Sequence, residues 1–233
     1  MAKKARIGHG YGSEWHLLRY LGRHRTLLGD KVRRATGASA IQWMDFHFKD
    51  DPPWWDGERA DLDFLDLFDD RDRVRSAWLD YWPHTGEMQN WDAVGILDFP
   101  KERRVLLVEA KAHVSELRSD CRAKLVGGRK RITEVLESVK EHLGVRPDAD
   151  WLRGYYQYCN RLAVLHFLNA NGVPAHLLFV YFVGDHFVGR QCPQSVEGWG
   201  QALGRMERHI GLPSRHELSD RVHKLFLDVR QQE

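Results

Sequence analysis

Asp92, Glu109 and Lys111 are the residues whose types and spacing could do chemistry, and they fall in two neighbouring apolar segments. Two carboxylates beside a lysine suit Mg²⁺, because this hard cation takes oxygen ligands and keeps several waters. The metal lowers the pKa of a bound water and stabilises charge on a phosphate, and Lys111 would position or help to deprotonate that water. Phosphodiester hydrolysis is therefore the predicted reaction.

A β-hairpin is the element that must position these residues. Segments 91–99 and 104–111 are β-prone and are separated by a turn-like stretch. With the turn centred immediately after Lys101, Asp92 lies opposite Lys111, and the three charged side chains share one face of the hairpin. A register shifted by one residue would move Asp92 to the other face, so the site depends on the pairing.

The strand before the Glu109 position is apolar enough to be buried, with the sequence Val-Leu-Leu-Val at 105–108. Charges at the end of such a strand cost free energy unless they are paired or bind a metal. Two interpretations follow from this cost. The charges form a functional site, or Glu109 and Lys111 form a structural ion pair in a general α/β protein.

Apolar periodicity and turn residues predict the surrounding elements. Ser13 is the expected N-cap of the first helix. Helices are expected at 14–28, 71–82, 114–125, 129–143, 152–171 and 195–210, a buried strand at 176–183, and a strand or helix end at 222–229. This order predicts a single α/β domain with a central mixed β-sheet flanked by helices.

The net charge of +2 conceals a strong asymmetry along the chain. Residues 1–34 contain nine Lys or Arg and two acids, residues 45–80 contain twelve acids and five bases, and residues 111–146 contain nine bases and five acids. Such blocks suggest contact with a nucleic acid, although a run of charge also occurs as an ordinary solvated face.

Asp92 together with Glu109-Ala110-Lys111 resembles the motif of the PD-(D/E)XK nuclease superfamily, which has the restriction-endonuclease-like fold. The expected order of helix, hairpin, helices and buried strand is similar to the core of that family. The resemblance covers roughly residues 10–30 and 88–184. It implies one nuclease-like domain over residues 1–233, with an acidic insertion at about 43–86.

The resemblance also implies roles for particular residues. Asp92, Glu109 and the Ala110 carbonyl would hold Mg²⁺, or Mn²⁺ in its place, and Lys111 would act on the water. Glu14 on the first helix and Gln157 on the helix 152–171 would assist. The candidate contacts to nucleic acid are Arg19, Arg23, Arg129, Lys130, Arg131 and Arg161. Trp91 stands where the family often has proline.

The expected function is a Mg²⁺-dependent endonuclease with DNA as its preferred substrate, and the main alternative is a catalytically inactive module of this fold that binds nucleic acid or a protein partner. Many nucleases of this fold pair to cut both strands, so a homodimer is a further expectation. Three scattered cysteines do not make a disulfide framework, and no run reaches the roughly 20 apolar residues of a membrane span. A soluble cytoplasmic protein is expected.

Overall fold

The computed structural model describes residues 10–44, 59–60, 62, 64–65, 70–83, 89–124 and 127–230. The elements are α1 (Ser13–Gly22), α2 (Arg25–Thr36), β1 (Ala40–Trp43), β2 (Arg59–Ala60), α3 (Arg71–Tyr81), β3 (Asn90–Trp91), β4 (Ala93–Asp98), β5 (Arg103–Lys111), the 3₁₀ helix η2 (Val114–Leu117), α4 (Gly128–His142), α5 (Tyr156–Ala170), β6 (Ala175–Val183), α6 (Val196–Ile210), η3 (Ser219–Arg221) and β7 (Val222–Asp228).

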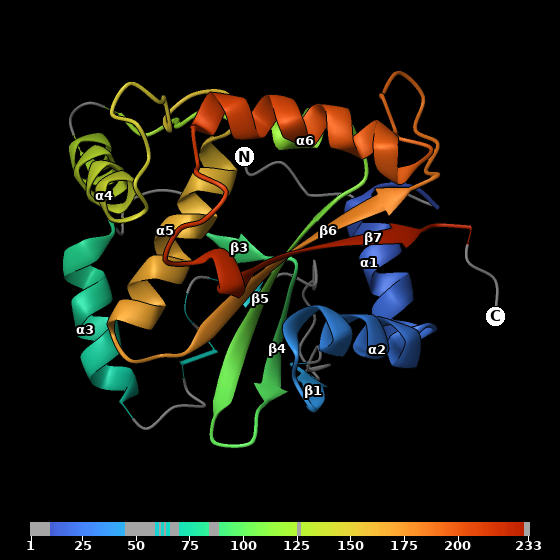
Figure 1. Ribbon diagram of the computed structural model, residues 1–233, viewed down its shortest axis with the longest axis horizontal. Helices are drawn as coiled ribbons and strands as arrows, with labels where there is room; N and C mark the ends of the chain where they lie inside the picture. The colour runs from blue at the N-terminus through green and yellow to red at the C-terminus, as the bar shows by residue number, and fades with distance from the viewer. Residues whose placement is uncertain are drawn as a thin grey trace, which may run out of the picture.

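A mixed five-stranded sheet forms the centre of the molecule, in the order β1-β4-β5-β6-β7 (Figure 1). The first three strands are antiparallel, whereas β5, β6 and β7 are parallel. A second small sheet contains β2 and β3. Helix α2 contacts both β1 and β7, which are the two edge strands, so the sheet curls around this helix. The expected α/β class with a central mixed sheet is confirmed.

The predicted hairpin is present, but the predicted register is wrong. Ala93 lies opposite Val108 and Asp98 lies opposite Arg103, which shifts the pairing by two residues. The cause is a shorter turn, in which the Phe99 N–H donates to the Glu102 carbonyl at 3.0 Å. Because side chains alternate with a period of two, a shift of two residues leaves the side chains of the paired residues in β4 and β5 on their expected faces.

Helices cover both faces of the sheet, so β5 and β6 are buried on both sides. On one face, α3, α4, α5 and α6 pack on residues that include Val105, Leu107 and Leu177. On the other face, α1 and α2 pack on residues that include Leu106 and Val108 (Figure 1). Burial on both faces explains the continuous apolar runs of these strands. Glu109 and Lys111 share the strand parity of Val105 and Leu107, which places them on the α5 face.

Two helix predictions are wrong in their extent. The helix expected at 14–28 is divided into α1 and α2 after Gly22, a residue with low helix propensity. The break lets each helix pack its own apolar face on the sheet. The N-cap of α1 is Gly12 rather than Ser13, and Ser13 Oγ donates a hydrogen bond to Glu116 Oε1 at 3.0 Å.

The helix expected at 114–125 is reduced to the single 3₁₀ turn η2. Backbone bonds to a distant loop replace the helical ones: the Ser119 N–H donates to the Gly154 carbonyl at 2.9 Å, and the Cys121 N–H donates to the Leu152 carbonyl at 2.8 Å. Tertiary pairing therefore overrides the local helical preference here. The segment 222–229, which the sequence left open, forms the strand β7.

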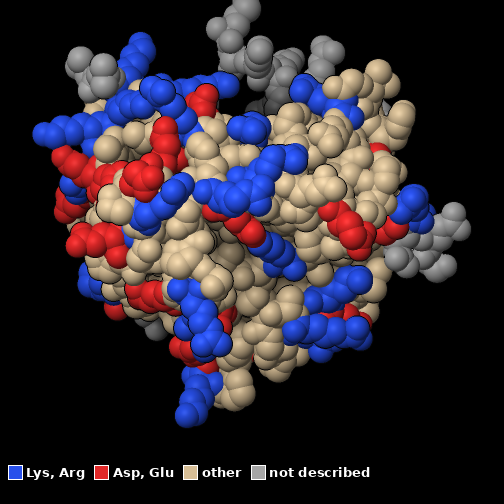
Figure 2. Space-filling model, turned by 45° about the horizontal axis from the view of Figure 1, so that its top comes forward, with Lys and Arg blue, Asp and Glu red and all other residues tan. Residues whose placement is uncertain are grey.

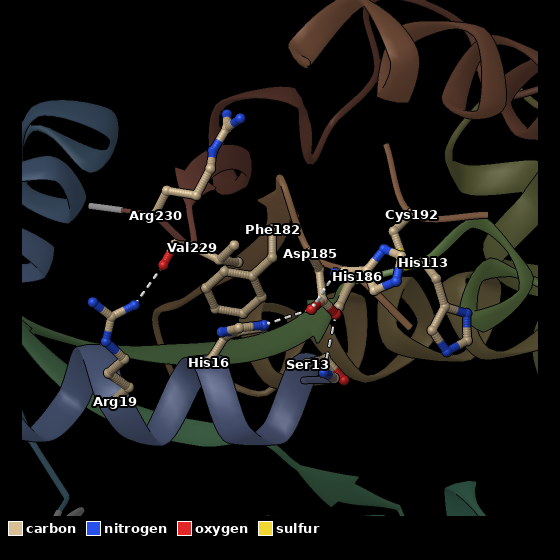
Figure 3. A network of polar contacts seen from close by, with 12 residues as sticks. Ser13, His16, Arg19, His113, Phe182, Asp185, His186, Cys192, Val229 and Arg230 are labelled. Carbon is tan, nitrogen blue, oxygen red and sulfur yellow. Dashed lines mark hydrogen bonds and ion pairs between the residues drawn. The ribbon is translucent and has the colours of Figure 1, made fainter. Parts of the chain in front are cut away.

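A buried acid at the end of β6 anchors the start of α1 (Figure 3). His16 and Asp185 point toward each other, with Nε2 and Oδ1 3.0 Å apart and both side chains buried. Asp185 also accepts the N–H of Gly12 at 3.0 Å and of His186 at 2.7 Å. Burial alone would raise the Asp185 pKa, but the hydrogen bonds from His16 and Gly12 outweigh it and lower the pKa. Gly12 has a φ of 90°, a conformation that glycine adopts without strain.

About half of the expected insertion at 43–86 lies outside the described residues, and α3 is its longest described element. None of the helices in the described part of the chain is long and apolar enough to cross a membrane.

We predict that Asp185→Ala lowers the free energy of unfolding by about 2–4 kcal/mol, since it leaves buried donors of α1 and of the following loop without their acceptor. Urea unfolding checks this value. The matched control is Asp148→Ala, because the Asp148 side chain is 72% exposed and pairs only at the surface with Arg146. Equal losses in the two variants would contradict the anchoring role of Asp185.

Candidate active site

Asp92 lies at an irregularity between β3 and β4. The Asp92 N–H donates to the Val108 carbonyl at 3.1 Å, while Ala93 is also paired with Val108. Two residues opposite one is the arrangement of a β-bulge, which redirects a side chain. Asp92 Oδ2 accepts the Ala110 N–H at 2.6 Å, so the carboxylate is held against the backbone of β5 beside Glu109.

Glu109 is buried between two cations. Its Oε1 pairs with Lys111 Nζ, and its Oε2 accepts a hydrogen bond from Arg161 Nε at 2.8 Å. The side chains of Glu109 and Arg161 are 3% and 6% exposed. A carboxylate this deeply buried requires a charged partner to remain ionised, and Glu109 has two of them.

Arg161 reaches the site from the middle of α5 and is held by several groups. Its Nη2 donates to the Asn90 carbonyl at 2.6 Å, and its Nη1 donates to Gln89 Oε1 at 3.3 Å. The guanidinium also lies 4.5 Å from the centre of the Trp91 ring, within the range of a cation–π contact. Arg161 therefore joins Glu109 on β5 to the strand that leads into Asp92.

The two carboxylic acids of the site have pKa values that are shifted in opposite directions. Burial and the nearby charge of Glu109 raise the pKa of Asp92 to about 7. Burial also opposes ionisation of Glu109, but Lys111 and Arg161 outweigh it and lower the Glu109 pKa. The carboxylates of Glu109 and Asp92 raise the pKa of Lys111 against the effect of burial. At neutral pH the site contains an ionised Glu109, two cations and an Asp92 near its titration midpoint.

The site offers some of the oxygen ligands that a hard cation such as Mg²⁺ needs. Asp92 and Glu109 are close enough to interact electrostatically, and the Ala110 carbonyl belongs to the residue between Glu109 and Lys111. Mg²⁺ is often bound through one or two carboxylates and several waters. Within the described ranges, no cluster of three or more His, Cys, Asp or Glu side chains could hold a metal. A cation at this position would depend on two carboxylates, a carbonyl and water.

The two assisting residues lie in elements that border the site. Glu14 is in the first turn of α1, next to Ser13, which Glu116 binds. Glu116 also accepts the N–H groups of Ala112 and His113, directly after β5, so it connects the start of α1 with the end of β5. Gln157 lies one helical turn before Arg161, and its N–H donates to Ser119 Oγ at 2.7 Å. Direct action of Glu14 or Gln157 on a reaction stays a prediction.

The six basic candidates for nucleic-acid contact do not form one group. Arg161 is buried against Glu109, and Arg19 donates to the Val229 carbonyl. Arg129 donates to the Cys121 carbonyl, Arg131 donates to the Asp80 carbonyl, and Lys130 and Arg23 are exposed. In Figure 2, Lys and Arg side chains are spread over the visible face among Asp and Glu. Nucleic-acid contact stays a prediction for all six, and the described contacts of Arg161 are internal.

Sequence reasoning missed one ion pair and two acids that shape the site. Arg161 was expected to contact nucleic acid from a cleft, and its pairing with Glu109 was missed, although an arginine inside the apolar run of α5 signals a buried charge that needs a partner. Glu116 accepts the N–H groups of Ala112 and His113 and was absorbed into a predicted helix. Asp185 carries no local signal, because its partners Gly12 and His16 are far away in the sequence.

Comparison of the chain with protein-family models, with curated proteins and with solved structures finds no match.

We predict that Asp92→Asn stabilises the metal-free protein at pH 8. The Asp92 pKa rises from 3.8 in the unfolded chain to about 7 in the folded protein, so ionisation opposes folding. The loss in free energy of unfolding that ionised Asp92 causes grows as pH rises from about 4 to about 7 and is constant above that. Thermal unfolding in EDTA should show an advantage of up to about 4 kcal/mol at pH 8, the free energy that corresponds to a pKa rise from 3.8 to about 7, and this advantage should shrink toward pH 4. An advantage that is independent of pH would contradict the raised pKa.

We predict that Arg161→Met lowers the free energy of unfolding by about 3 kcal/mol or more, since it removes one partner of a buried ion pair. Arg153→Met, at an exposed position, is the matched control and should change stability by less than about 0.5 kcal/mol. Chemical denaturation measures both values. A small loss for Arg161→Met would mean that Lys111 alone keeps Glu109 ionised.

Proposed function

We propose that this chain is a metal-dependent nuclease of the restriction-endonuclease-like fold that hydrolyses phosphodiester bonds, with DNA as its preferred substrate. The observation that supports it best is the convergence of Asp92, Glu109 and Lys111 at the carboxyl end of β5. The shared environment raises the pKa of a carboxylic acid toward neutrality. Strongly shifted pKa values of this kind are concentrated at functional sites.

The order of elements supports the same proposal at the level of the fold. An N-terminal helix, the antiparallel strands β1, β4 and β5, the helices α4 and α5, and the parallel strand β6 follow one another along the chain. This order is similar to the core of helix, three-stranded meander, helix and strand that the resemblance implies. Glu109 lies on the central hairpin of β4 and β5, and Asp92 lies directly before β4.

The proposed roles follow from the position of each group. Asp92, Glu109 and the Ala110 carbonyl would hold Mg²⁺ or Mn²⁺, and when bound the cation would polarise a water and stabilise charge on the phosphate. The Lys111 ammonium would orient the attacking water. Arg161 is a positioning residue, because it fixes Glu109 relative to the segment that leads into Asp92. Glu14 would add a carboxylate from α1.

We predict cleavage of DNA that requires Mg²⁺ or Mn²⁺ and stops with EDTA. Asp92→Asn and Lys111→Met should each lower the rate roughly hundredfold or more, because each removes a charge that acts at the reacting phosphate. Lys140→Met is the matched control, since Lys140 is also buried and also pairs with a glutamate, but on α4. Plasmid, linear and single-stranded DNA and RNA should be assayed side by side.

The possible results distinguish this proposal from its rivals. Binding of nucleic acid without metal-dependent cleavage of any substrate would favour the inactive binding module. Absence of both would favour a structural role for the Glu109–Lys111 pair. Cleavage that persists in both site variants would move the active site elsewhere.

A further inference from the structure

Both carboxylate oxygens of Glu109 are already occupied by cationic side chains. Lys111 Nζ forms an ion pair with Oε1, and Arg161 Nε donates to Oε2 at 2.8 Å. Each oxygen keeps a second lone pair for a ligand, but a divalent cation bound there would lie beside the Lys111 ammonium or the Arg161 guanidinium, and the like charges would repel. Metal binding is therefore favoured when one of these two positively charged side chains moves away from Glu109.

The two cations are held to different extents. Arg161 makes directed contacts with Glu109, Gln89, the Asn90 carbonyl and the Trp91 ring, and its side chain is 6% exposed. Lys111 is the last residue of β5, its side chain is 12% exposed, and its ammonium sits on a flexible four-carbon stem. Movement of Arg161 would break four contacts, whereas movement of Lys111 breaks its ion pair with Glu109. Lys111 is the group that can leave.

The Lys111 ammonium also sits where a bound cation would sit. The ammonium pairs with Glu109 Oε1, and Asp92 Oδ2 accepts the N–H of Ala110, the residue between Glu109 and Lys111. Both carboxylates raise the Lys111 pKa, so the ammonium lies in the field of both. A metal ion shared by those carboxylates would face a like charge at short range. Glu116 is the third carboxylate that acts on Lys111, and it offers a direction in which the ammonium can move.

We propose that Lys111 occupies the cation position of the site and that a divalent metal ion binds by displacing its ammonium from Glu109 toward Glu116. This inference rests on the proposed function and adds a regulation to it. Lys111 keeps the buried carboxylates neutralised in the metal-free protein. Once displaced, the same ammonium lies beside the metal position, where it can orient a water.

Mn²⁺ titration of the 233-residue chain by calorimetry tests this competition without depending on catalysis. Lys111→Met should bind Mn²⁺ roughly tenfold more tightly than the wild type or better, because the competing charge is gone. Lys111→Gln, which keeps a hydrogen-bond donor for Glu109, should show the same direction if the methionine variant folds poorly. Lys140→Met should match the wild type, and Asp92→Asn should weaken binding. Circular dichroism verifies that each variant is folded.

Tighter binding in the Lys111 variants, including binding that appears only in them, supports displacement. Equal affinity in the wild type and the Lys111 variants overturns displacement and leaves the metal site intact. Absence of Mn²⁺ binding in every variant overturns displacement together with the metal site of the proposed function.

Discussion

The buried charge of Glu109 is the constraint on which the rest of the site depends. It lies on the strand at the centre of the sheet, where an ionised carboxylate is stable only with partners. Lys111 supplies one partner from the same strand face, and Arg161 supplies the other from α5. Arg161 is itself fixed by the segment before Asp92, so one ion-pair network sets the relative positions of β3, β5 and α5.

The same end of the sheet gathers the polar groups that hold α1. Glu116, just beyond β5, binds Ser13, and Asp185, just beyond β6, binds Gly12 and His16. The carboxyl ends of parallel strands lie at one edge, and ligands of open α/β sheets bind at such edges. The first turn of α1 is therefore attached by two acids at the edge that contains the candidate site.

Stability and the proposed chemistry are in conflict at Asp92. Burial and Glu109 disfavour the ionised form of this residue, and the fold tolerates the cost instead of replacing the acid with an amide. Two neighbouring carboxylates are what a cation site requires, and Lys111 and Arg161 offset their charge in the metal-free protein. A residue that lowers the stability of the fold, such as this buried acid, is expected where it is needed for function.

The sequence by itself predicted the candidate site residues and determined that Glu109 and Lys111 share one face of their strand, because alternation along a strand is a local property. It also predicted α3, α4, α5, α6 and the buried strand β6, since their apolar patterns and turn residues are local as well. Only the tertiary structure decided the hairpin register, the loss of the helix at 114–125 and the pairing of Arg161 with Glu109. The lost helix and the Arg161–Glu109 pair depend on partners distant in sequence, such as the 52 residues that separate Arg161 from Glu109, and local pattern carries no information about such partners. The register instead follows from the length of the turn between Phe99 and Glu102, which composition alone does not fix.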